Sequence, residues 1–220
     1  MRLNSYLINM HTKGGIDKKS LNYILEENSL KYGPGYIHIF PKIHRLDQLV
    51  LQNIFNCAIS IDTIIPPGRP IISRIGSVTE YIGHYIVHFL VPIVQNQCTY
   101  IKETTYFINK IESLRPHANC WLVSFDITNM FTNMPINEIL PAVRKAYDTF
   151  DKSDFKVKCP PTDDLIYLLR SVLENNVFEF DGKLFIQKIG VAIGAMPSPE
   201  CCDILMFQIM RHFFKILKIP

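Results

Sequence analysis

The sequence lacks several features that mark particular classes of protein. Its six cysteines show no C-x-x-C spacing, and we interpret them as reduced thiols of an intracellular protein. The first 15 residues contain no apolar run of signal-peptide length. The most apolar stretch, residues 85–94, is too short to span a bilayer. We therefore expect a protein of the nucleus or cytoplasm that has no membrane partner.

A strong charge bias, internal repeats and low-complexity tracts are also lacking. Lysine and arginine number 23 against 20 acidic residues, which gives a net charge of +3. That charge is compatible with nucleic-acid binding but does not by itself indicate it. The length of 220 residues and the 48% hydrophobic content are those of an ordinary globular protein with one large domain or two small ones.

The pattern of apolar residues predicts an α+β chain that is rich in helices. Predicted helices cover residues 16–29, 78–95, 104–114, 136–150 and 163–175, and a last one begins near residue 199. Predicted strands lie within residues 36–45, 64–73 and 120–127. Residues 177–187 form two alternating runs around Asp181-Gly182, which predicts a hairpin with a tight turn.

Asp126 lies near the end of the predicted buried strand 120–127, where it ends a run of apolar residues, within the stretch WLVSFDITNMFTNMP. One interpretation is a turn or cap residue, because Thr128 and Asn129 follow it. The other is a ligand of a hard divalent cation such as Mg²⁺, which binds one or two carboxylates together with substrate phosphates. The residues alone leave both interpretations open.

Five segments of the sequence share a resemblance to one family. They are FPKIHR (40–45), GRPIIS (68–73), TYIKETTYFINKI (99–111), FDITNMFTNMP (125–135) and GVAIGAMPSP (190–199). Each resembles a motif of the reverse transcriptases of Penelope-like retroelements, and the five occur in the order of that family. The resemblance covers roughly residues 20–220.

The resemblance implies a right-hand polymerase fold with fingers, a partial palm and a small antiparallel sheet. The expected parts are an N-terminal helical lead-in (1–35), a fingers-like region (36–118) and a partial palm (119–220). The implied function is RNA-directed DNA polymerisation in a retrotransposon, with an RNA or DNA template-primer and dNTP as partners and Mg²⁺ or Mn²⁺ as cofactor. The alternative is a non-catalytic remnant, retained by the host, that binds nucleic acid or protein.

The resemblance also assigns site residues. Asp126 matches a catalytic metal ligand, Arg69 a contact to the triphosphate, and Phe131 the aromatic that excludes a ribose 2′-hydroxyl. The remaining assigned positions contact the nucleotide (Ile127, Gly194, Pro199) or phosphate (Lys42, Arg45). The glycine-rich turn departs from the family pattern at residues 193, 195 and 196. We expect Arg69 and the backbone at Gly194 to face the same cleft as Asp126.

A complete polymerase palm requires further carboxylates. No Asp-Asp pair occurs after residue 200, and the earlier pair Asp163-Asp164 opens a predicted helix, where it suits the positive N-terminal end. Thumb and GIY-YIG nuclease segments are not recognisable either. We therefore expect a chain that stops inside the palm and that is catalytically inactive by itself.

Overall fold

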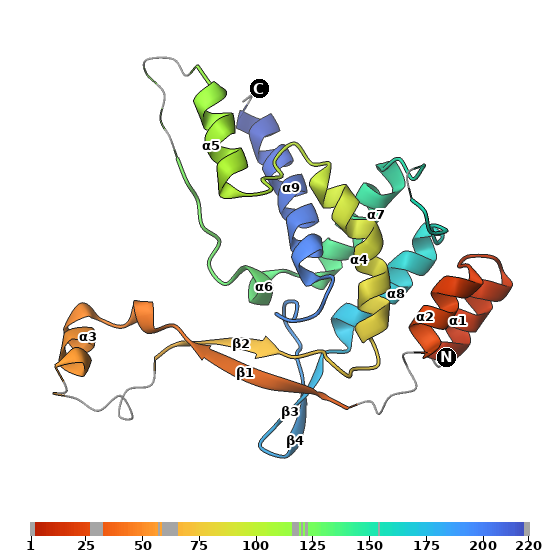
Figure 1. Ribbon diagram of the computed structural model, residues 1–220, viewed down its shortest axis with the longest axis horizontal. Helices are drawn as coiled ribbons and strands as arrows, with labels where there is room; N and C mark the ends of the chain where they lie inside the picture. Colours follow the sequence, from red (N-terminus) through yellow and green to blue (C-terminus); the bar gives the residue numbers. More distant parts are fainter. Residues whose placement is uncertain are drawn as a thin grey trace.

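The computed structural model describes residues 3–26, 33–56, 58, 66–115, 119, 121, 123–153 and 155–217. These residues form a helix-rich mixed α/β structure with one small sheet (Figure 1). The helices are α1 (Leu3–Thr12), α2 (Lys18–Glu26), α3 (Gln48–Phe55), α4 (Glu80–Gln95), α5 (Thr104–Ser113), α6 (Met130–Asn133), α7 (Ile136–Thr149), α8 (Thr162–Glu174) and α9 (Ser198–Leu217), with a 3₁₀ turn at Ile43–Arg45. In the described parts of the chain, no helix is both long and apolar enough to cross a bilayer.

The hydrophobic core lies among helices α4, α7, α8 and α9, which pack against one another. The apolar residues of α4 recur at helical spacing, so one face of this helix is buried. Phe89 at its centre is fully buried and makes edge-to-face ring contacts with Tyr85, Tyr147 and Phe155. This core is built from elements on both sides of Asp126 in the sequence.

The sheet contains four strands in the order β2-β1-β3-β4. They are β1 (Gly35–Pro41), β2 (Gly68–Ile72), β3 (Val177–Phe180) and β4 (Lys183–Ile186). The β1–β2 and β3–β4 pairs are antiparallel, whereas β1 and β3 pair in parallel. The sheet is therefore mixed, and the expected antiparallel arrangement holds for two of its three strand pairings. The parallel pair is possible because helices α3 to α8 intervene between the two strands in the sequence.

Figure 1 shows how the strands position the candidate site. The long β1–β2 pair projects away from the helical core and carries α3 at its far end. The β3–β4 hairpin closes with Asp181 (φ 51°) and Gly182 (φ 67°), both in the left-handed region, as the Asp-Gly pair predicts. The other predicted helices and strands are also present, except for the strand at 120–127.

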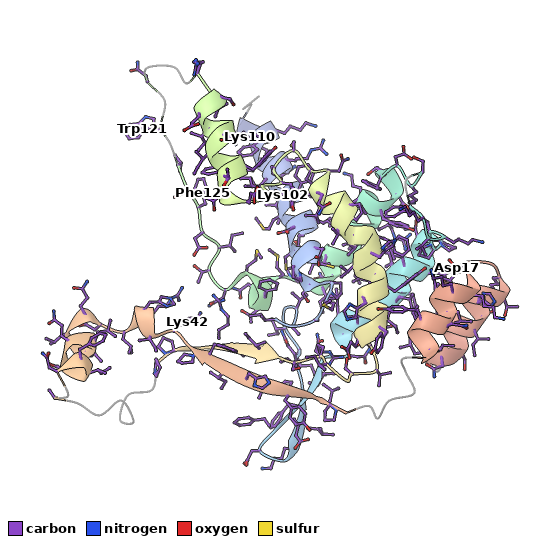
Figure 2. All side chains as sticks on the ribbon, in the orientation of Figure 1. Asp17, Lys42, Lys102, Lys110, Trp121 and Phe125 are labelled. Carbon is purple, nitrogen blue, oxygen red and sulfur yellow. The ribbon has the colours of Figure 1, made fainter. Side chains whose placement is uncertain are left out.

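The predicted buried strand at 120–127 was wrong. Residues 121 and 123–127 are irregular and exposed, while Cys120 and Leu122 lie outside the described residues. The side chains of Trp121 and Phe125 are 93% and 88% exposed and project from an extended segment outside the helical core (Figure 2). A strand requires a paired neighbour, and no described strand pairs with this segment. An apolar run indicates what a segment could bury, but it does not supply that neighbour.

Four cysteines lie in the described part of the chain and are free thiols. They are Cys98, Cys159, Cys201 and Cys202. The other two, Cys57 and Cys120, fall outside the described residues. No disulfide joins the four cysteines that the structure describes.

Candidate functional site

A cavity of about 410 Å³ lies between β2, the 3₁₀ turn that follows β1, and the segment that leads into α6. Six of the sequence-predicted site residues line it: Lys42, Arg45, Arg69, Asp126, Ile127 and Phe131. Gly68, Asn129, Thr132 and Ile193 contribute to the same lining. Figure 2 places Lys42 at the far end of β1, on the side toward the segment leading to α6.

Arg69 is positioned by the pairing of β2 with β1. It lies opposite Phe40 in the antiparallel register, and Gly68 lies opposite Pro41. A Cβ atom at Gly68 would overlap the side chain of Ile39, so glycine permits the close approach of the two strands. The Lys42 N–H donates to the Pro67 carbonyl over 2.8 Å and closes this end of the strand pair. The register therefore places Arg69 beside the 3₁₀ turn that carries Arg45.

The turn that follows Asp126 is stabilised by polar residues. Asn129 adopts the left-handed conformation, with a φ of 51°. The Thr132 hydroxyl donates to the Asn129 carbonyl over 3.0 Å, and the Asn133 amide donates to the Thr128 carbonyl over 3.0 Å. The sequence interpretation assigned no role to these contacts, although Thr and Asn commonly bond nearby backbone groups in turns.

The glycine-rich turn, residues 190–199, contacts both α6, which follows Asp126, and β2, which carries Arg69. Gly190 packs against α6, because a Cβ atom there would lie 2.5 Å from the Thr132 carbonyl. The Val191 N–H donates to the Phe131 carbonyl over 2.8 Å. Gly194 has a φ of +112°, and a Cβ atom there would overlap the carbonyl of Ile72 in β2. The turn therefore fixes the distance between α6 and β2.

Two predicted residues are placed outside the cavity lining. Gly194 supports the cavity through its neighbour Ile193, whose carbonyl accepts the Ile72 N–H over 2.9 Å. Pro199 is an exposed residue in the first turn of α9 and does not line the cavity. The backbone at Gly194 thus meets the expectation of a shared cleft only through its neighbour, and Pro199 does not contact it.

The charged side chains of the lining favour an anionic ligand. Lys42, Arg45 and Arg69 supply three positive charges, and Asp126 supplies one negative charge, so the lining carries a net charge of +2. Lys42 donates a long hydrogen bond of 3.4 Å to the Asn129 side chain. The side chains of Arg69 and Asp126 have no hydrogen-bond or ion-pair partner among the described residues. Both are therefore available to a ligand, and an arginine fork matches phosphate oxygens.

The residues that line the cavity do not fit a two-metal centre. Asp126 is its one carboxylate, and the described residues contain no group of three or more His, Cys, Asp or Glu side chains able to hold a metal. Two divalent cations a few ångströms apart require several carboxylates. Asp163 and Asp164 do not line the cavity: Asp163 pairs with Arg144 over 2.7 Å, and Asp164 accepts the Tyr6 hydroxyl over 2.6 Å. At most, Asp126 could hold one cation together with phosphates of a ligand.

Comparisons with known proteins leave the family open. No protein-family model matches the chain, and neither curated proteins nor solved structures yield a match. The resemblance to Penelope-like reverse transcriptases therefore rests on the five sequence segments alone.

Proposed function

We propose that this chain is part of an RNA-directed DNA polymerase of the Penelope-like kind and that its 410 Å³ cavity binds a deoxynucleoside triphosphate. The observation that carries the proposal is the convergence of four of the five motifs, since residues 99–111 do not line the cavity. Segments 40–45, 68–73, 125–135 and 190–199 each contribute to the lining of this one cavity. Short chance matches, scattered along an unrelated chain, have no reason to meet around a single cavity.

Each lining residue has a role in this proposal. The Arg69 guanidinium binds phosphate oxygens, and Lys42 and Arg45 add positive charge beside it. Phe131 is half-buried against the core, so its ring is held in place and would lie against the sugar. A ribose 2′-hydroxyl would then collide with the ring, whereas a deoxyribose would not. Ile127 supplies an apolar wall.

We expect binding of the nucleotide without its incorporation. The described residues place one carboxylate in the cavity, and phosphoryl transfer depends mainly on the positioning of charges around the phosphates. Primer extension with Mg²⁺ or Mn²⁺ by this chain alone is therefore expected to be undetectable. The template-primer and the two metal ions belong to the function of a complete polymerase.

Because the described residues contribute a single carboxylate to the cavity, a second, non-catalytic function is also consistent with it. A non-catalytic remnant that binds nucleic acid or protein would need the positive charges of the cavity but no selection of a deoxynucleotide. The two functions differ in their ligand, because the polymerase site binds free triphosphates and the remnant does not.

Calorimetric titration with dATP and with deoxyadenosine tests the proposal. We expect dATP to bind and deoxyadenosine to bind far more weakly, because the phosphates supply the contacts to Arg69. Arg69→Gln should weaken dATP binding about 10- to 100-fold, which corresponds to the roughly 1.5–3 kcal/mol of a hydrogen bond to a charged group. Arg115→Gln is the matched control, because Arg115 is exposed and lies outside the cavity. Equal affinity for dATP in the wild type and Arg69→Gln would contradict the proposal.

A further inference from the structure

A second cavity, of about 570 Å³, lies at the other end of β2 and shares no lining residue with the first. It is an open cavity that is lined by the β2–α4 loop, the last turns of α8 and the start of β3. Arg74, Ser77 and Thr79 line its polar side, and Tyr167, Val177 and Leu184 contribute to its apolar side. The sequence motifs gave no role to any of these six residues.

Arg74 is a buried cation without a counter-ion in the described part of the chain. Its side chain is 7% exposed, and neither of the two ion pairs found there includes it. Two of its five N–H groups have protein acceptors: one donates to the Thr79 hydroxyl over 2.7 Å and one to the Val177 carbonyl over 3.3 Å. Nε is buried and has no partner. Burial lowers the pKa of this guanidinium.

A buried, unpaired guanidinium lowers the stability of the folded protein unless an anion lies beside it. A buried charge in a protein is normally paired and fully hydrogen-bonded, because its hydration has been lost. Ser77 beside it is 3% exposed, and its hydroxyl likewise has no hydrogen-bond partner. The Thr79 hydroxyl accepts its bond from Arg74, so its own hydrogen is free to donate. The polar side of the cavity thus holds a guanidinium whose Nε has no partner and two hydroxyl groups that can donate, and no carboxylate of the described residues lines it.

The loop that carries these donors is fixed by its own hydrogen bonds. The Ser77 N–H donates to the Arg74 carbonyl over 3.0 Å, and the Gly33 N–H donates to the Gly76 carbonyl over 3.1 Å. The one acidic side chain near the start of α4, Glu80, accepts the Gly76 N–H over 2.6 Å and forms no ion pair with Arg74. The donors are therefore held in place before any ligand binds.

We propose that this second cavity binds a small oxyanion, a phosphate monoester or a carboxylate, that carries an apolar group. The oxyanion accepts hydrogen bonds from Arg74, Ser77 and Thr79 and neutralises the guanidinium. The apolar group packs against the opposite wall, where the Tyr167 ring is stacked on Tyr6 with ring centroids 3.9 Å apart. This inference is independent of the polymerase proposal, because it uses none of the residues of the first cavity.

Thermal unfolding of the full chain with four probes tests the inference. The probes are inorganic phosphate, phenyl phosphate, benzoate and the neutral benzyl alcohol. We expect phenyl phosphate or benzoate to raise Tm more than inorganic phosphate does, and benzyl alcohol to leave Tm unchanged. The stronger of the two aromatic anions identifies the oxyanion. The inference is overturned if no anion raises Tm, or if benzyl alcohol raises it as much as the anions do.

Variants locate the bound anion. Arg74→Gln should abolish the Tm shift, whereas Arg69→Gln should retain it, since Arg69 lines the other cavity. Ser77→Ala removes a hydroxyl that has no hydrogen-bond partner in the protein, so this variant should fold normally. Titration should nevertheless show that it binds the anion at least about threefold more weakly than the wild type does. A shift that is lost in Arg69→Gln, or an affinity unchanged in Ser77→Ala, contradicts the assignment.

Discussion

Replacement of Gly194 by alanine tests the contact that joins the glycine-rich turn to β2. Gly194 has a φ of +112°, a conformation that costs an L-residue roughly 1–3 kcal/mol. The new Cβ atom would also overlap the Ile72 carbonyl, and relieving that overlap would disturb the hydrogen bond from the Ile72 N–H to the Ile193 carbonyl, about 0.5–1.5 kcal/mol. We therefore expect Gly194→Ala to lower the free energy of unfolding by about 2–4 kcal/mol.

Substitutions at two other glycines separate the two parts of this loss of stability, the left-handed backbone conformation and the overlap of the new Cβ atom with its neighbours. Gly182 has a φ of +67° but no atom within 4 Å of an added Cβ, so Gly182→Ala should cost only the left-handed conformation, about 1–2 kcal/mol. Gly33 has neither a positive φ nor a neighbour within 4 Å, so Gly33→Ala should be neutral or stabilise by about 0.4–1 kcal/mol.

Urea denaturation followed by circular dichroism measures all three variants on one scale. We expect Gly33→Ala to be the most stable of the three variants, Gly182→Ala to be intermediate and Gly194→Ala to be the least stable. If Gly194→Ala loses no more than Gly182→Ala, the close contact between the turn and β2 is refuted. In that case the turn could not fix the geometry of the first cavity.

Three further variants test other parts of the fold. Phe89→Ala should cost about 3–5 kcal/mol in urea denaturation, because the ring is fully buried among other aromatic rings; a loss below about 1 kcal/mol would contradict that packing. The double variant Trp121→Ser with Phe125→Ser should change the free energy of unfolding by less than about 0.5 kcal/mol, since both side chains are almost fully exposed, and a large loss would show that they are packed. Burial raises the pKa of Glu200, so the folded state binds its proton more tightly than the unfolded state does, and stability should fall as the pH rises above about 4.5. Glu200→Gln should remove that part of the pH dependence, and an unchanged pH profile would exclude Glu200 as its source.

Most local elements of the fold could be predicted from the sequence, because their signals are local. The apolar spacing in residues 78–95 predicted α4, and the Asp181-Gly182 pair predicted the turn of the β3–β4 hairpin. The strand at 120–127 could not be judged in this way, since a strand depends on a partner elsewhere in the chain. The parallel pairing of β1 with β3 was missed for the same reason, because nothing in either strand specifies the direction of its neighbour.

The residues whose side chains line the candidate site could be predicted from the sequence. The packing contacts that support the site could not. Matching to motifs placed Arg69, Asp126 and Phe131 in one cavity. It included Gly190 in the glycine-rich segment but did not predict the close approach of this residue to Thr132, which only the three-dimensional structure reveals. Nor did any motif point to Arg74, because the absence of a counter-ion is a property of the fold and not of the sequence around it.

The central claim is that the first cavity selects a deoxynucleotide, and a comparison of Kd for dATP and ATP tests it most directly. Because Phe131 lines the cavity and is held against the core, we expect the wild type to bind dATP at least about tenfold more tightly than ATP, a difference of about 1.4 kcal/mol. Phe131→Val should bring the two constants together by strengthening the binding of ATP. Equal Kd values for dATP and ATP in the wild type would contradict the claim.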